Sequence, residues 1–151
     1  MLISINWLKR HIDLPESIEE IEKTLTAVGL EVEGKTEPGK IFEKLVVAKV
    51  LTCEKHPDSD HLHVTTVNNG QEVIQVVCGA PNIQAGQTVV LAPIGAELPL
   101  PNGEKLKMKK SKIRGVESFG MICAEDEIGL SDDHGGIMVL DDSIEAGTPF
   151  V

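Results

Sequence analysis

Hydrophobic and polar positions divide the chain into a helical N-terminal part and a longer part made of short strands. Near the start, apolar residues recur three or four positions apart, as on the buried face of a helix: Ile18, Ile21, Leu25 and Val28. Ser17 and Glu20 form an S-x-x-E capping box before this face, and Gly29 follows it as the helix stop. A shorter helix is predicted over residues 7–11, with Asn6 as its N-cap.

Residues 1–5 and 30–33 are predicted as strands beside these helices. A segment of about forty residues with so few elements cannot bury an adequate core by itself. We therefore interpret residues 1–40 as a short α+β segment that is part of a domain completed elsewhere. Residues 41–151 are expected to form a second domain.

That second domain consists of short apolar runs separated by turn residues. The predicted strands cover residues 45–54, 62–67, 72–78, 88–92, 105–114, 120–123 and 137–140, with a helical turn at 125–128. Asn68-Asn69-Gly70 is a hairpin signal between the second and third of them. Five or more strands without βαβ alternation indicate a mainly β fold. The expected architecture is a small OB-fold barrel.

Positive charge is concentrated in one stretch, KLKMKKSKIRG, from Lys105 to Gly115. It holds six of the 14 basic residues, which we call the basic run: Lys105, Lys107, Lys109, Lys110, Lys112 and Arg114. Charged and apolar positions alternate up to Lys109, as on a strand with one exposed face, and the parity then changes by one. A β-bulge near Lys109–Lys110 would return all six cations to one face.

The remainder of the chain is acidic. The formal net charge is −10, and nine acidic residues but no Lys or Arg follow Arg114. This balance excludes a protein that coats nucleic acid through general positive charge, so an anionic partner has to bind locally at the basic run. Aromatic residues make up only 3% of the chain. We therefore expect phosphate contacts on a folded RNA rather than a strand of stacked bases.

Cysteine and histidine patterns do not indicate catalysis or a metal site. The three cysteines, Cys53, Cys78 and Cys123, are widely spaced without a CxxC pair, as free thiols in a reducing cytoplasm are. Three histidines lie close together without the spacing of a zinc site: His56, His61 and His63. Cys123 with His134 as nucleophile and base is disfavoured because Cys123 lies in an apolar strand.

No signal peptide or membrane-spanning run is recognised, so we expect a cytoplasmic chain with no membrane partner.

Several motifs occur in order over residues 42–151: HPDSDHL from His56, VCGAPN from Val77, KKSKIRGVES from Lys109, GMIC from Gly120 and EIGL from Glu127. The series resembles the tRNA-binding OB domain shared by several aminoacyl-tRNA synthetases and free tRNA-binding proteins. The resemblance implies tRNA as the partner, with His61, Asn82 and Ser118 as contacts beside the basic run. His61 stands where the family usually has Lys or Arg, and Phe119 stands where a polar or acidic residue is common.

Three further motifs resemble the start of the bacterial phenylalanyl-tRNA synthetase beta subunit family: ISINWLK from Ile3, VGLEVE from Val28 and SDDH from Ser131. In that family the N-terminal segment is half of a domain interrupted by the OB insertion. The resemblance implies a longer parent protein in an α2β2 heterotetramer, with tRNA(Phe) and the alpha subunit as partners. ATP and Mg²⁺ would bind to parts of the parent outside this chain, which itself would be non-catalytic, without a cofactor or metal and without DNA as a ligand.

Two other interpretations are open at this point. The barrel could be an inter-domain or subunit packing module whose lysines contribute only solubility. It could also be a stand-alone tRNA-binding protein or a chaperone-like dimer.

Overall fold

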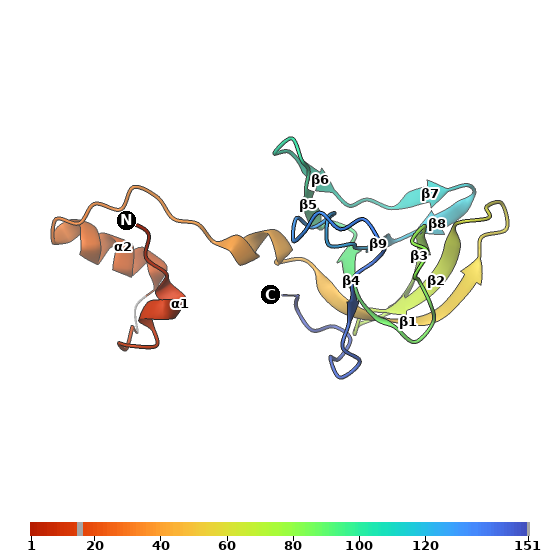
Figure 1. The fold of residues 1–151 in the computed structure, drawn as a ribbon, viewed down its shortest axis with the longest axis horizontal. Helices are drawn as coiled ribbons and strands as arrows, with labels where there is room; N and C mark the ends of the chain where they lie inside the picture. The colour runs from red at the N-terminus through yellow and green to blue at the C-terminus, as the bar shows by residue number, and fades with distance from the viewer. Residues whose placement is uncertain (15–16, 151) are drawn as a thin grey trace. The chain divides into compact units, whose positions relative to one another are not determined.

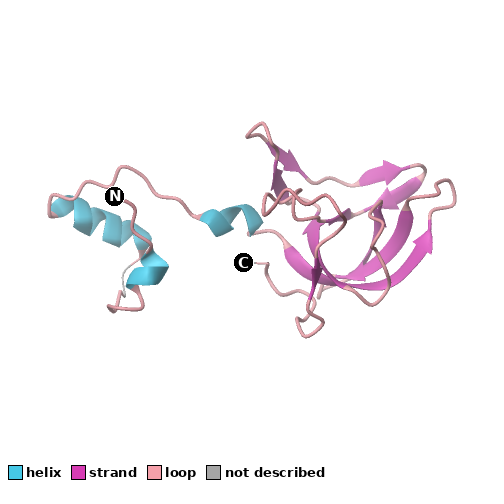
Figure 2. Ribbon diagram, in the orientation of Figure 1, coloured by secondary structure: helices cyan, strands magenta, loops and turns pink. Residues whose placement is uncertain are grey.

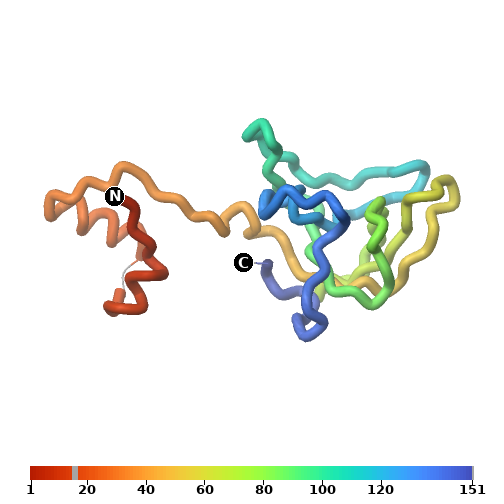
Figure 3. Tube along the Cα trace, in the orientation of Figure 1, coloured from red at the N-terminus to blue at the C-terminus, as the bar shows by residue number. Residues whose placement is uncertain are grey.

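The computed structural model describes residues 1–14 and 17–150. The chain forms two compact units, Met1–Glu37 and Pro38–Val151, which Figures 1 and 3 allow the reader to follow by residue number. No helix in the described residues is both long enough and apolar enough to cross a membrane.

The first unit contains the helices α1 (Ile5–Leu8) and α2 (Ile18–Ala27). The predicted capping box of α2 is confirmed, because Ser17 Oγ accepts from the Glu20 N–H and Glu20 Oε2 accepts from the Ser17 N–H. Gly29, at φ +89°, ends the helix as predicted. The N–H groups of Gly29 and Leu30 return to Thr26 O and Leu25 O, which is the Schellman pattern.

Other local predictions for this unit are wrong. Helix α1 begins before residue 7, because Ser4 rather than Asn6 is its N-cap and accepts from the Trp7 N–H at 3.3 Å. The strands expected at 1–5 and 30–33 do not form in the described residues 1–14 and 17–37. A strand needs a neighbour to satisfy its backbone groups, and these segments have none there. No described residue of the unit is buried.

The second unit is mainly β, which confirms the predicted fold class. Its principal sheet contains six strands: β1 (Val46–Lys55), β2 (His63–Asn68), β3 (Val73–Cys78), β4 (Thr88–Pro93), β9 (Gly120–Ile122) and β10 (Val139–Leu140). The order is β10-β4-β1-β2-β3, and β9 pairs with β4. Figure 2 shows the strands curving into a nearly closed, OB-like barrel. The short 3-10 helix η1 (Pro38–Phe42) precedes β1.

Strand β1 bends so that it can pair with two partners. Its first half pairs with β4, and its register with β2 shifts between Val50 and Thr52. A bulge of this kind increases the local twist that a small barrel needs. Strand β3 completes the barrel through hydrogen bonds near β9 and the short strand β8 (Val116–Ser118), in which Phe119 N donates to Gln75 O and Val77 N donates to Ser118 Oγ. Barrel closure therefore depends on a few individual hydrogen bonds rather than a full ladder.

Strand β4 separates two hydrophobic clusters and is buried on both of its faces. Val89 and Leu91 point into the barrel with Val50, Val67 and Val76. Val90 and Ala92, on the opposite face, pack with a second cluster that includes Leu45, Leu98, Cys123 and Ile128. Apolar burial is the main stabilising term in folding. Both clusters lie in the second unit, so this unit holds the core.

Four short strands form two hairpins beside the main sheet. Strand β5 (Glu97–Pro99) pairs with β6 (Lys105–Lys107), and β7 (Ser111–Ile113) pairs with β8 (Val116–Ser118). The continuous strand predicted over residues 105–114, with a bulge near Lys109–Lys110, is therefore wrong. Residues 108–110 are not in a strand. The change of parity in the sequence marks a change of partner strand, not a bulge.

Candidate nucleic-acid interface

The basic run is divided between the two hairpins and the link that joins them. Lys105 and Lys107 lie in β6, Lys112 lies in β7, and Lys109 and Lys110 lie in the link. Arg114 is in the turn between β7 and β8. All six residues are exposed. Figure 1 shows this segment running along one side of the barrel, from the β5–β6 hairpin to the β7–β8 hairpin.

Each hairpin also carries one glutamate opposite its lysines. Glu97 pairs in register with Lys107, and its carboxylate lies 3.6 Å from Lys105 Nζ. Glu117 pairs in register with Lys112, and its carboxylate lies 2.9 Å from Lys110 Nζ. Both ion pairs are exposed, so each stabilises the fold by at most about 1 kcal/mol. The two glutamates reduce the local positive charge, and sequence spacing alone did not reveal this effect.

Three lysines of the basic run form no direct ion pair within the described residues: Lys107, Lys109 and Lys112. Within residues 1–14 and 17–150, no carboxylate lies within salt-bridge distance of their ammonium groups. An ammonium on a flexible stem is a suitable contact for a phosphate oxygen. These three lysines therefore form the part of the basic run that is available to an external anion.

The turn between β7 and β8 holds Arg114 in an unusual conformation. Arg114 has φ +48° and Gly115 has φ +85°, as a two-residue type I′ hairpin requires. Arg114 is the one non-glycine residue with positive φ in the described chain. Its Nη1 donates to Asp58 O at 2.8 Å. The guanidinium thus ties this turn to the loop between β1 and β2.

His56 supports the same junction from inside. The side chain is 3% exposed, and its Nδ1 accepts from the Asp58 N–H at 3.0 Å. Because Nδ1 is an acceptor, Nε2 carries the proton and donates to Ile113 O, also at 3.0 Å. His56 is consequently a structural residue that joins the β1–β2 loop to β7.

His61 lies in that loop and is exposed. Its N–H and that of Leu62 both donate to Ser59 Oγ, which gives the loop its shape. His61 and Arg114 line one shallow pocket, together with Lys55 and with two carboxylates, Asp58 and Asp60. The loop brings His61 close to the end of the basic run, a proximity that the residue numbering does not suggest.

Ser118 and Asn82 are occupied by internal hydrogen bonds. Ser118 is 1% exposed, donates to Gly120 O and accepts from the Val77 N–H. The Asn82 amide donates to Ile137 O and accepts from the Ile137 N–H, both at 3.0 Å. Both side chains therefore hold the barrel together, and these hydrogen bonds direct their polar groups to the protein rather than to a ligand.

Phe119 is next to the basic run and is half-buried. Lys110 Nζ lies 5.2 Å from the centre of its ring, within the range of a cation–π contact. The ring also lines a second pocket, between the β2–β3 hairpin and the turn after β4. The pocket joins Phe119 to residues distant in the sequence, so spacing along the chain does not reveal it.

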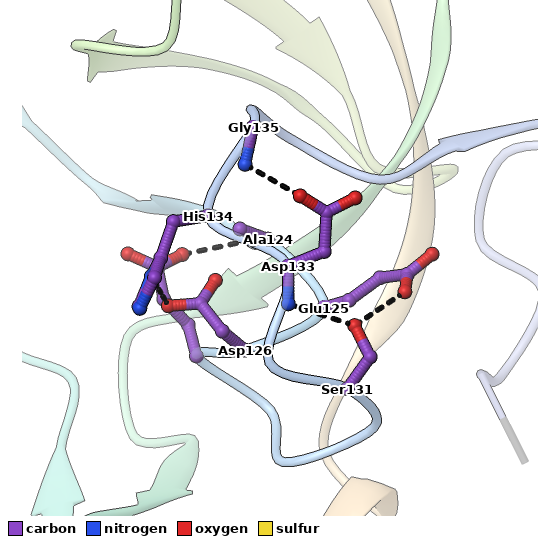
Figure 4. Close-up of polar contacts among 8 residues, drawn as sticks. Ala124, Glu125, Asp126, Ser131, Asp133, His134 and Gly135 are labelled. Carbon is purple, nitrogen blue, oxygen red and sulfur yellow. Dashed lines mark hydrogen bonds and ion pairs between the residues drawn. The ribbon is translucent and has the colours of Figure 1, made fainter.

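The acidic segment after β9 is held by its own hydrogen bonds, which Figure 4 shows. Glu127 accepts from the Ala124 N–H, and Ser131 Oγ donates to Glu125 at 2.7 Å. His134 contacts Asp126, not Cys123. Burial, with a smaller contribution from Glu127, raises the pKa of the Cys123 thiol to about 12. Cys123 and His134 therefore do not form a nucleophile and base.

Comparison with known proteins identifies the family of the chain. The sequence model of the family described as putative tRNA binding domain matches residues 45–149. Over 98% of its length the chain is 53% identical to the phenylalanine–tRNA ligase beta subunit of Bacteroides thetaiotaomicron. It is 46% identical over 99% of its length to the same subunit of Syntrophotalea carbinolica. The chain spans only 18% of the length of each of these relatives.

A solved structure supports the fold alone. The MetRS related protein from Pyrococcus horikoshii aligns with a TM-score of 0.52 at 18% identity. The alignment covers 76% of this chain and 96% of that protein.

Proposed function

The chain belongs to the putative tRNA binding domain family, and from this premise we propose that its barrel binds the phosphate backbone of tRNA through the basic run. The observation that carries the proposal is the set of three exposed lysines without an ion-pair partner in residues 1–14 and 17–150: Lys107, Lys109 and Lys112. On a chain with net charge −10, these lysines give an anion a local place to bind.

Lys105, Lys110 and Arg114 have weaker roles in the proposed contact. Each already has a partner on the protein, which a phosphate would have to share or replace. His61 contributes to the proposed RNA contact at the end of the basic run where Arg114 lies. Ser118 and Asn82 act indirectly, by keeping the barrel closed, because their hydrogen-bonding groups are used internally.

The relatives suggest the larger protein to which such a barrel contributes. We propose that the chain is part of a phenylalanine–tRNA ligase beta subunit and assists the aminoacylation of tRNA(Phe) together with an alpha subunit in the cytoplasm. ATP and Mg²⁺ would then act elsewhere in the parent enzyme. The described residues contain no group of three metal-ligating side chains arranged around a common point.

The barrel has ends suited to insertion into another domain. The Gly147 N–H donates to Val47 O and the Phe150 N–H donates to Leu45 O, so the last described residues lie against the start of β1. Phe42 and Phe150 also pack with ring centres 5.7 Å apart. Entry and exit of the barrel are therefore adjacent. This supports the proposal that residues 1–40 are half of a domain interrupted by residues 41–151.

The proposal is tested by titrating tRNA at several salt concentrations with a triple variant, Lys107→Ala, Lys109→Ala and Lys112→Ala. Losing three phosphate contacts should weaken binding and reduce the slope of log K against log salt by about 2 to 3. Lys9→Ala with Lys23→Ala and Lys40→Ala is the control, because it removes the same charge outside the basic run. Equal slopes for both triple variants and the wild type would contradict the proposal and favour the packing interpretation.

A further inference from the structure

A pocket beside the basic run remains unused by the contacts described so far. Three separated parts of the second unit line it: the β2–β3 hairpin, the turn after β4 and the junction of β8 and β9. Val73 and Ile94 contribute aliphatic walls and are 58% and 50% exposed. Phe119 contributes an aromatic ring, and Asn69 and Gln75 contribute side-chain amides.

The lining combines the groups that recognise a nucleobase. A flat aromatic ring with aliphatic side chains provides a stacking surface. Amide side chains can donate to and accept from a base edge. Gln75 Nε2 is already bonded to Glu117 O, but within residues 1–14 and 17–150 no hydrogen bond uses Gln75 Oε1 or the Asn69 amide nitrogen.

The charges around the pocket favour a particular orientation of a bound nucleotide. Glu72 is among the lining residues, and its negative charge disfavours a phosphate inside the pocket. Lys110 Nζ lies 5.2 Å from the centre of the Phe119 ring and belongs to the basic run. A base inside the pocket with its phosphate at Lys110, where the phosphate would share the ammonium with Glu117, keeps the phosphate away from Glu72 and is continuous with the proposed phosphate-binding surface.

We propose that this pocket binds one unstacked base of an RNA whose backbone lies along the basic run. The inference rests on the proposed function, because the basic run brings the RNA to the pocket. The pocket would add a contact to a single base, because a chain with only 3% aromatic residues has too few of them to stack a whole strand of bases. Single-stranded regions and loops supply such accessible bases.

The test compares Phe119→Leu with the wild type for binding to a short single-stranded oligoribonucleotide and to the matching abasic oligomer. Loss of stacking should weaken binding to the base-containing strand by about tenfold. Binding to the abasic oligomer and the salt dependence should stay unchanged, because no phosphate contact is lost. Phe42→Leu is the matched control and should bind as the wild type does, since that ring packs on Phe150 outside the pocket.

Two further measurements separate the possible failures. Phe119→Trp should retain binding to the base-containing strand, and the Val73 and Ile94 methyl NMR signals of the wild type should shift with that strand but not with the abasic one. If these signals do not shift and Phe119→Leu binds normally, while the triple lysine variant still shows the reduced salt slope with tRNA, the base site is wrong and the proposed function stands. A wild-type chain that binds tRNA but neither oligomer would likewise overturn the base site alone, and one that binds neither oligomer and no tRNA would overturn both.

Discussion

The three cysteines are core groups rather than reactive thiols. Burial raises the pKa of all three thiols. Cys123 is the least exposed of them, and its pKa rises to about 12. A thiolate is the nucleophilic form of cysteine, and such a thiol stays protonated near neutral pH. The apolar neighbours of Cys123 in the sequence already indicated this environment.

Cys123 should make the stability of the chain depend on alkaline pH. The ordinary pKa of a cysteine thiol is 9.0, and that of Cys123 in the folded chain is about 12. Between these pH values the Cys123 thiol loses its proton in the unfolded chain and keeps it in the folded chain. The folded state therefore binds more protons, and the free energy of unfolding should fall as pH rises, by at most about 1.4 kcal/mol per pH unit from this group.

Urea unfolding of the wild type and of Cys123→Ala at pH 8 and pH 10 measures this effect. The variant should show a smaller decrease between the two pH values. Cys53→Ala serves as the control, because Cys53 is only partly buried. An identical decrease in wild type and Cys123→Ala would contradict the interpretation.

At the scale of elements, the β7–β8 hairpin determines how the basic run is presented. Sequence alternation predicted strand structure around residues 105–114 but assigned it to one strand. The choice of partner strands, β5 for one part and β8 for the other, depends on contacts between distant residues. For the same reason Glu97 and Glu117 could not be identified as neighbours of the lysines from spacing alone.

The hairpin turn should be sensitive to Gly115. At φ +85° a side chain with a Cβ is strained, although no atom would lie within 4 Å of that Cβ. We expect Gly115→Ala to destabilise the fold by about 1 to 3 kcal/mol in urea unfolding, from backbone strain alone. Gly115→Asn should cost less, because Asn tolerates this conformation. Equal stabilities for Ala, Asn and Gly would exclude backbone strain as the cause.

At the scale of the whole molecule, the two units differ in how many residues each of them buries. All buried residues of the described chain lie in the second unit. The first unit leaves large apolar side chains exposed, including Trp7 at 57% and Val28 at 69%. A helix of ten residues has little stability without tertiary packing. The proposal that residues 1–40 are part of a domain completed elsewhere rests on these facts.

Amide hydrogen exchange on the intact chain should reveal this difference. Amides in β1 and β4 should be protected to near the global free energy of unfolding, whereas those in α2 should exchange about as fast as in a short isolated helix. Ser17→Ala, which removes the capping bond, should accelerate exchange in α2 only. Protection in α2 equal to that in β4 would contradict the proposed incomplete domain.

The sequence by itself determined what depends on local pattern: the capping box at Ser17, the hairpin at Asn68–Gly70, the β-rich barrel class and the location of the positive charge. Spacing, turn residues and alternation carry these features, because they act over a few neighbouring positions. Only the tertiary structure decided which lysines form ion pairs, that the Ser118 and Asn82 side chains are hydrogen-bonded internally, and that Phe119 lines a pocket. Each of these features depends on neighbouring side chains or backbone groups that strand pairing or distant parts of the chain bring close. The tertiary fold alone determines those neighbours.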